Sequence, residues 1–178
     1  MNVLVLVGSL RADSFNVQLA TAAADLLPAG VTWQLSDHLP SLPFYSEDLD
    51  RAGAPESVQA FRAAVAAADA LIIATPEYNG SVSAPLKNAI DWASRPREDA
   101  SLAGKPVAVL AASAAPRGAQ WAREDLVRIL TVAGARPIAT TVGIGSGYET
   151  LADGVPADTE AQLLGLVHTL VSEVPAAA

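Results

Sequence analysis

The chain has 178 residues, of which 51% are hydrophobic and 17% are charged; this is the balance of a globular domain and excludes a disordered chain. Its formal net charge of −8 argues against binding to nucleic acid or to an acidic membrane surface. It contains no cysteine, which excludes disulfides, thiolate catalysis and cysteine-ligated metals, and we expect no metal site. Because an apolar strand begins at residue 2 and no apolar run approaches membrane-spanning length, we expect a cytoplasmic protein without a signal peptide.

Five segments have the length and the apolar content of β-strands. The first, third and fourth are apolar almost throughout, as strands covered on both faces would be. The second alternates around Trp33 and fits a more exposed strand. The predicted strands are residues 3–7, 31–35, 70–75, 106–113 and 138–142.

Segments with the apolar spacing of helices alternate with these strands. Ser14 is a suitable N-cap for the first of them. The predicted helices are residues 14–27, 55–68, 82–93, 121–133 and 159–174. Between these elements we expect a long loop at residues 36–53, a charged turn at residues 95–99 and a glycine-rich segment around Tyr148.

Strands that alternate with helices predict an α/β three-layer sandwich with a five-stranded parallel sheet. In the flavodoxin-like order 2-1-3-4-5, the connections of strands one and three leave in opposite directions, and ligands bind in the crevice at their carboxyl ends. We expect residues 1–174 to form one such domain and residues 175–178 to form a frayed tail. The loops after the first, third and fourth strands would then converge on one crevice.

The loop after the first strand carries groups that suit a phosphate. Ser9, Ser14 and Asn16 supply hydrogen-bond donors, and Arg11 supplies a cation beside a helix N-terminus, where free N–H groups favour an anion. The segment has neither the spacing of a dinucleotide-binding glycine motif nor that of a P-loop, so it does not indicate ATP hydrolysis. Taken alone, it fits a capped helix beside a solvated arginine equally well.

The loop after the third strand, residues 76–81, suits the ring of a flavin. Its backbone N–H groups can face the heteroatoms of the ring, and Tyr78 and Asn79 can pack or hydrogen-bond at its edge. Taken singly, Tyr78 fits a turn aromatic and Glu77 fits an acid near a helix start. The loop after the fourth strand, residues 113–120, should close the same crevice.

Three blocks of the sequence stand out: Gly8-Ser9-Leu10-Arg11 with Ser14 and Asn16, Pro76-Glu77-Tyr78-Asn79 with Ser81, and Leu86-Lys87-Asn88-Ala89-Ile90-Asp91-Trp92. Together they resemble the NAD(P)H-dependent FMN reductase family, whose members include quinone, chromate and azo reductases. The resemblance extends from residue 2 to about residue 143. It implies a flavodoxin-like fold, non-covalent FMN, and a dimer or a dimer of dimers with FMN near the subunit interface.

The resemblance also implies an activity. Hydride would pass from NAD(P)H to N5 of FMN, and an acceptor such as a quinone, a flavin, an azo compound or a metal oxyanion would then take the electrons. Because the chemistry occurs at the flavin, no catalytic acid or base of the protein is expected. Two alternatives remain open: an FMN electron carrier of the flavodoxin type, and a binding or regulatory module without flavin.

Matching positions in the family imply the cofactor contacts. The FMN phosphate would be held by Ser9, Arg11, Ser14 and Asn16, with the backbone N–H of Phe15, and the isoalloxazine would be lined by Pro76, Glu77, Tyr78, Asn79, Gly80 and Ser81. Lys87, Asn88, Asp91 and Trp92 would have a structural or interfacial role, and residues 43–48 resemble a family segment that lies at the partner subunit or over the flavin.

The loop after the fourth strand departs from the family pattern. Many relatives have a Gly-Gly pair beside the pyrimidine edge of the flavin, whereas this chain has Ala and Pro, which restrict the path of the backbone. We still predict cofactor contacts from Ser113 and Arg117. Arg117 would reach the pyrimidine side of the flavin or a phosphate of the nicotinamide cofactor, and it fits a solvated loop charge equally well.

Overall fold

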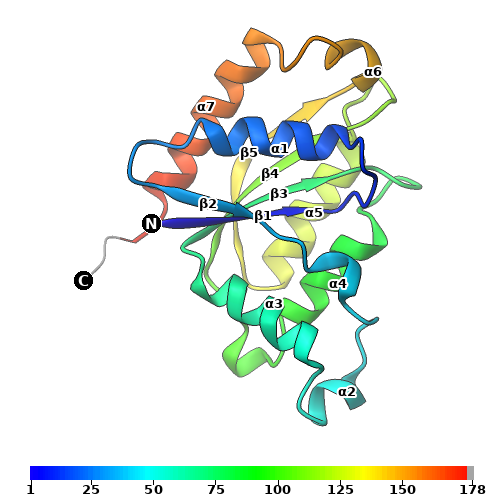
Figure 1. Cartoon of the computed structure of the whole chain (residues 1–178), viewed down its shortest axis with the longest axis vertical. Coiled ribbons are helices and arrows are strands. Elements are labelled where there is room, and N and C mark those ends of the chain that lie inside the picture. The colour runs from blue at the N-terminus through cyan, green and yellow to red at the C-terminus, as the bar shows by residue number, and fades with distance from the viewer. Residues whose placement is uncertain (176–178) are drawn as a thin grey trace.

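The computed structural model describes residues 1–175 and contains a parallel sheet in the order β2-β1-β3-β4-β5. Helices cover both faces of this sheet (Figure 1). The strands are β1 (Asn2–Val7), β2 (Thr32–Leu35), β3 (Ala70–Thr75), β4 (Pro106–Ala112) and β5 (Arg136–Ile144). The predicted fold class and strand order are confirmed.

Two apolar cores lie on opposite faces of the sheet. Successive side chains of a strand point to opposite faces, so Val5 and Ile72 pack on one side and Leu4 and Ile73 on the other. Because both faces are covered, the central strands are apolar along almost their whole length, with Asn2 and Thr75 as the polar residues at strand ends, as the sequence predicted. The first core is covered by α1 (Phe15–Asp25) and α7 (Ala157–Ser172), and the second by α3 (Glu56–Ala67), α4 (Ala84–Ala93) and α5 (Gln120–Val132).

The prediction was wrong where short helices interrupt the expected loops. Residues 36–53 contain the 3₁₀ helix η1 (Leu39–Ser41) and the helix α2 (Glu47–Arg51), and Ser46 caps α2 by accepting a hydrogen bond from the Leu49 N–H. Helices of three to five residues show no repeated apolar spacing, so the sequence pattern does not reveal them. The glycine-rich segment likewise contains α6 (Gly147–Thr150), the charged turn contains η2 (Arg97–Asp99), and β5 is longer than the predicted residues 138–142.

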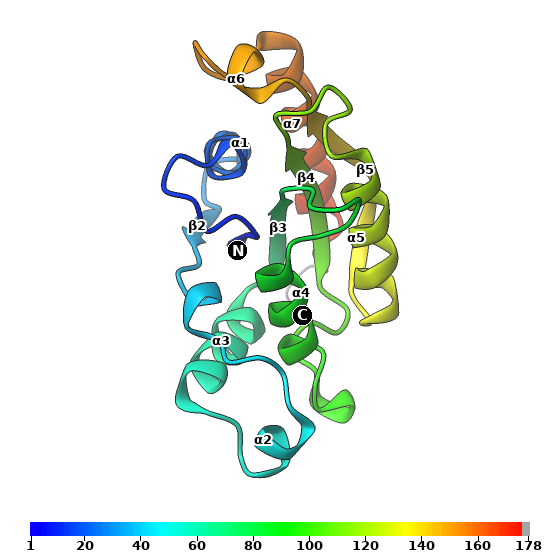
Figure 2. The same ribbon diagram turned by 90° about the vertical axis from the view of Figure 1, so that its right-hand side faces the viewer.

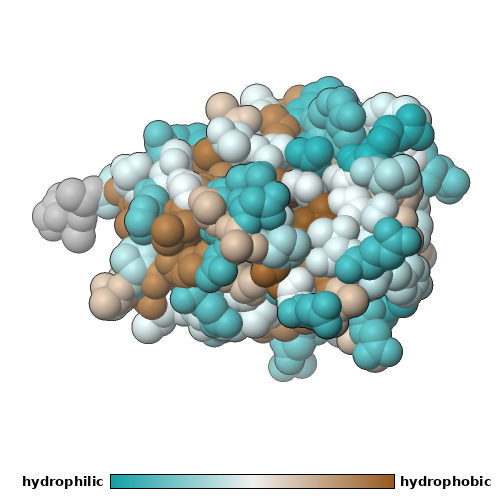
Figure 3. Space-filling view, turned by 90° about the horizontal axis from the view of Figure 1, so that it is seen from above, coloured by the Kyte–Doolittle hydropathy of each residue, from teal (hydrophilic) through white to brown (hydrophobic). Residues whose placement is uncertain are grey.

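The carboxyl ends of the parallel strands meet at one edge of the sheet, which faces the viewer in Figure 2. The face above the α1 and α7 layer carries hydrophilic side chains around patches of hydrophobic ones (Figure 3). Among the described residues, no helix combines the length and the apolar content needed to span a bilayer.

Candidate functional site

A pocket of about 160 Å³ lies at the carboxyl ends of β1, β3 and β4. It is lined by Ser9, Arg11, Ser14, Phe15, Asn16, Pro76, Glu77, Tyr78, Ala112, Ser113 and Ala114. The structure therefore brings together the three loops that were predicted to converge, those after β1, β3 and β4. The predicted residues Asn79, Gly80, Ser81 and Arg117 do not line this pocket, and the prediction missed Ala112 and Ala114, whose position beside Ser113 at the end of β4 was the available signal.

The start of α1 forms the end of the pocket that suits an anion. Ser14 is buried, and its Oγ accepts hydrogen bonds from the N–H groups of Asn16 at 3.2 Å and Val17 at 3.4 Å, so it is the predicted N-cap. Arg11 is exposed, and within residues 1–175 its guanidinium has no hydrogen-bond or ion-pair partner. A helix N-terminus beside such a cation is a suitable place for a phosphate group.

Asn16 ties the start of α1 to the end of β4. Its Nδ2 donates to the Ala112 carbonyl oxygen at 2.9 Å, and the Ala112 N–H donates to its Oδ1 at 2.8 Å. The side chain is buried, so these bonds are shielded from water. The contact with a phosphate stays a prediction, whereas the observed role of Asn16 is to join two walls of the pocket.

The loop after β3 forms a two-residue hairpin. The Tyr78 N–H donates to the Ser81 carbonyl oxygen at 3.1 Å, and the Ser81 N–H donates to that of Tyr78 at 3.2 Å. Between them, Asn79 and Gly80 both have positive φ angles, of 52° and 75°. Two-residue hairpin turns with two positive φ angles favour the sequence Asn-Gly, so the shape of the turn explains why Asn79 and Gly80 occur here. Tyr78 remains 54% exposed at the mouth of the pocket.

The same hairpin is attached to α5. The Glu77 Oε2 accepts a hydrogen bond from the Ala122 N–H at 3.0 Å, in the first turn of α5, where the helix dipole favours a carboxylate. Ser81 donates from its hydroxyl to the Asp125 carboxylate, one turn further along α5. These two contacts orient the hairpin. Through them the side chains of Glu77 and Ser81 are bonded to α5.

The loop after β4 is held against β5. Arg123 donates from Nε to the Gly118 carbonyl oxygen at 3.1 Å and from Nη1 to Thr141 Oγ1 at 2.7 Å. Burial lowers the pKa of Arg123, while the nearby Glu124 and Glu77 carboxylates raise it. A Cβ on Gly145 would lie 2.1 Å from the carbonyl oxygen of Pro116, so the backbones of the loop and the end of β5 touch at this point.

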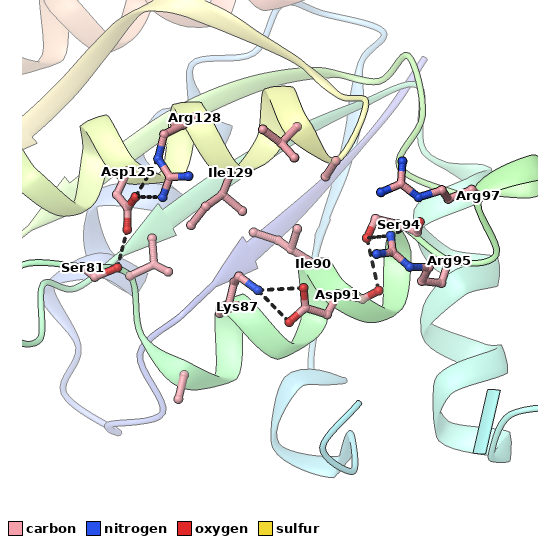
Figure 4. Close-up of a pocket in the computed structure, with 14 residues that line it drawn as sticks. Ser81, Lys87, Ile90, Asp91, Ser94, Arg95, Arg97, Asp125, Arg128 and Ile129 are labelled. Atoms are coloured by element: carbon pink, nitrogen blue, oxygen red, sulfur yellow. Dashed lines mark hydrogen bonds and ion pairs between the residues drawn. The ribbon is translucent and has the colours of Figure 1, made fainter. Parts of the chain in front are cut away.

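A second and larger cavity, of about 490 Å³, lies between α4 and α5 (Figure 4). Ile90 and Ile129 line it, together with charged side chains of which some form ion pairs and two, Arg95 and Arg97, form none among residues 1–175. The Lys87 Nζ lies 2.7 Å from Asp91 Oδ1, and Arg128 pairs with Asp125. Hydrogen bonds from Ser81 and Arg128 hold the pKa of Asp125 below its ordinary value. We call this cavity the α4–α5 groove.

The third block of the family resemblance has a structural role within this chain. Asn88 accepts a hydrogen bond from the Tyr45 N–H at 2.8 Å and donates to the Pro43 carbonyl oxygen at 2.9 Å. Trp92 donates from Nε1 to the same oxygen at 2.8 Å, and its ring meets that of Tyr45 edge-on at 4.8 Å. Asn88 and Trp92 therefore fix the segment around Phe44 on α4.

A five-stranded parallel sheet in this order, with a pocket at the carboxyl ends of its central strands, defines an α/β protein of the flavodoxin-like class. Residues 1–149 match the family model for NADPH-dependent FMN reductase, and the chain belongs to this family.

Individual relatives agree with the family assignment. The chain is 44% identical over 138 residues, 78% of its own length and 74% of the relative's, to the NAD(P)H-dependent FMN reductase PA1204 of Pseudomonas aeruginosa. It is 45% identical over 126 residues, 71% of its length and 68% of the relative's, to a 2-hydroxy-1,4-benzoquinone reductase of a Burkholderia species. The solved structure of FerB, a flavoenzyme NAD(P)H:(acceptor) oxidoreductase of Paracoccus denitrificans, is similar with a TM-score of 0.86, 34% identity, and coverage of 97% of this chain and 96% of FerB.

The protein is thus an NAD(P)H-dependent oxidoreductase of a family that uses FMN, with NAD(P)H as co-substrate. The predicted family, enzyme class and cofactor are confirmed, and the electron-carrier and flavin-free alternatives are set aside.

Proposed function

We propose that the 160 Å³ pocket is the FMN site of this oxidoreductase. The observation that carries the proposal is the guanidinium of Arg11, which lies without a partner among residues 1–175 beside the capped N-terminus of α1. This pair of features suits a doubly charged phosphate. In this proposal the pocket holds the phosphate end and one edge of the ring, and much of the ring stays accessible to NAD(P)H and the acceptor.

FMN, when bound, supplies the hydride-accepting and hydride-donating chemistry. In this proposal the residues of the chain bind and orient it. Arg11, Ser9 and the N–H of Phe15, the first residue of α1, hold the phosphate, since the N–H groups of Asn16 and Val17 are bonded to Ser14. Pro76 and Tyr78 flank the ring from the hairpin, and Ser113 flanks it from the loop after β4. The contacts of Glu77 and Ser81 with α5 keep the hairpin in place.

We propose small, flat quinones as acceptors. The name of the Burkholderia relative and those of further quinone reductases at about 40% identity support this class. The half-exposed ring of Tyr78 at the mouth of the pocket also supports it, because a flat acceptor can pack there. Flavins, azo compounds and metal oxyanions are the other acceptors to compare in steady-state assays.

Replacing Arg11 by Ala tests the FMN site. Loss of a charge-assisted hydrogen bond should weaken FMN binding about tenfold or more, measured by titration of flavin fluorescence. Arg51→Ala is the matched control, since Arg51 lies on α2 and pairs with Glu47 on an exposed surface. An unchanged dissociation constant for Arg11→Ala would refute the assignment of the phosphate site.

We further propose that the chain self-associates as a dimer or tetramer through the face that carries the α4–α5 groove. The groove has apolar side chains at its base, and Val132 at its edge is 74% exposed.

We also propose a cytoplasmic location, where NAD(P)H is available, which cell fractionation would test. Residues 1–174 are proposed to act as one domain, supported by the single sheet with a core on each face. Of the predicted tail at residues 175–178, residues 176–178 lie outside the described part of the chain.

A further inference from the structure

The guanidinium of Arg117, in the loop after β4, lies over an aromatic ring. Its guanidinium carbon is 4.2 Å from the centroid of the Trp121 ring, within the range of a cation–π contact. Trp121 is 48% exposed, and Arg117 is exposed as well. In the described part of the chain, no carboxylate pairs with Arg117. Stacking fixes the plane of a guanidinium while its N–H donors remain available at the edge of that plane.

The pair stands beside the proposed FMN site. The loop that carries Arg117 begins with Ser113 and Ala114, which line the pocket. Trp121 contacts the hairpin on the other side, since a Cβ built on Gly80 would lie 3.4 Å from its Cε3 atom. The pair is therefore attached to the same two segments, after β3 and β4, that form walls of the pocket.

The charges around the pocket favour an anionic ligand for this pair. Arg11 is the one cation among the residues that line the pocket, and the proposed function uses it for the FMN phosphate. Because the net charge of −8 repels a polyanion, a polyanionic ligand needs a cation close to the pocket in order to bind. NAD(P)H carries a pyrophosphate, and NADPH carries a further 2′-phosphate. When its nicotinamide ring lies over the flavin, these groups extend beyond the pocket, whereas a small quinone has no part that reaches so far.

We propose that Arg117 binds a phosphate group of the adenine dinucleotide co-substrate and that Trp121 is a positioning residue that holds its guanidinium. The inference rests on the proposed FMN site, because that site determines where the nicotinamide lies. The phosphate comes either from the 2′-position, which NADPH alone carries, or from the pyrophosphate, which both dinucleotides carry.

Steady-state kinetics of the FMN-loaded enzyme test the proposal and distinguish the two sources. Arg117→Gln should raise the KM for NADPH about tenfold and leave kcat within about twofold. An unchanged KM for NADH identifies the 2′-phosphate, and an equal rise identifies the pyrophosphate. Trp121→Leu should give a smaller rise of the same kind, and Arg117→Lys should restore part of the loss. Arg136→Gln is the matched control, because Arg136 pairs with Glu173 at the amino end of β5.

Binding of nucleotide fragments separates this proposal from the proposed function. Adenosine 2′,5′-bisphosphate and ADP are titrated calorimetrically into the FMN-loaded protein, with no turnover required. Arg117→Gln should weaken binding of at least one of them about tenfold. Unchanged binding of both fragments, or a rise only in the KM for the quinone, would overturn the role of Arg117. Unchanged FMN binding in Arg11→Ala would instead refute the FMN site, and the fragment titration still decides the role of Arg117.

Discussion

The α4–α5 groove is larger than the pocket at the strand ends, yet the smaller pocket is the proposed cofactor site. The groove is about 490 Å³ and the pocket about 160 Å³. The groove lies between two helix faces, and Asp91 and Asp125 are each paired with a cation there. The pocket contains Arg11, which has no partner among residues 1–175, beside a helix N-terminus. The groove also contains Arg97, which has no ion-pair partner among residues 1–175, so a free cation alone does not distinguish the two regions. The pocket differs because its cation lies beside a helix N-terminus at the carboxyl ends of the strands.

The two regions are also held together differently. The walls of the pocket are joined by hydrogen bonds between distant segments, above all by Asn16 and Ala112. The groove depends on two neighbouring helices and on ion pairs within single helices, such as Lys87 with Asp91. Damage to a wall of the pocket should therefore affect both folding and cofactor binding. A change at a groove residue that does not hold the hairpin, such as Val132, should leave FMN binding intact, whereas Asp125 bonds Ser81 of the hairpin and belongs to both regions.

Asn16→Ala should have the largest effect. It leaves the buried N–H and carbonyl groups of Ala112 without their partners, so the free energy of unfolding should fall by about 2 kcal/mol, measured by urea denaturation of the FMN-free protein. FMN should also bind more weakly, because two walls of the pocket are no longer joined. Asn88→Ala is the matched control, since it also removes an amide that bonds one N–H and one carbonyl group, those of Tyr45 and Pro43. If both variants bind FMN as the wild type does, the proposed contrast between the two regions is wrong.

Val132→Glu should have an intermediate effect and should act on the groove alone. Val132 is 74% exposed, so the free energy of unfolding of a single chain should change by less than about 0.5 kcal/mol. A carboxylate at a packed interface is costly, so light scattering coupled to gel filtration should show a shift towards monomer. FMN affinity should remain at the wild-type value. A wild-type assembly in this variant would count against the groove face as the contact between copies.

The smallest effect should come from the pH dependence of Asp125. Hydrogen bonds from Ser81 and Arg128 lower its pKa in the folded protein, so it stabilises the fold above its unfolded pKa of about 4. That contribution is lost as the pH falls through the lower, folded value. Asp125→Asn should therefore lower the free energy of unfolding by less than about 1 kcal/mol at neutral pH, and the difference should shrink below about pH 4. A difference that does not vary between neutral and acid pH would show that the carboxylate charge is not involved.

The fold was predictable because each central strand is a continuous apolar run followed by a loop. Val3 to Val7 and Ala70 to Thr75 indicate buried parallel strands, and their alternation with helices leaves few possible strand orders. The helix α2 was not predictable in this way, because it buries none of its five residues and so has no apolar stripe.

The location of the pocket was predictable because the carboxyl ends of neighbouring parallel strands meet. The partners of individual side chains were not. Nothing near Asn16 in the sequence indicates a contact 96 residues away, and nothing near Ser81 indicates Asp125. The sequence suggested that Glu77 is an acid near a helix start. It does bond a helix start, but the helix is α5 and not α4, which follows Glu77 in the chain. Such contacts depend on how elements pack after they form.

The bond between Asn16 and Ala112 also has a consequence for the newly made protein. Residues 1–111 contain Arg11, the start of α1 and the hairpin after β3, but they lack the backbone groups to which Asn16 binds. A nascent chain that ends before β4 therefore carries Arg11 and Tyr78 of the proposed FMN pocket before it can join the two walls of that pocket. If the pocket is the FMN site, as proposed, we expect FMN to load only after β4 has left the exit tunnel, rather than to guide the earlier folding of β1, α1 and β3.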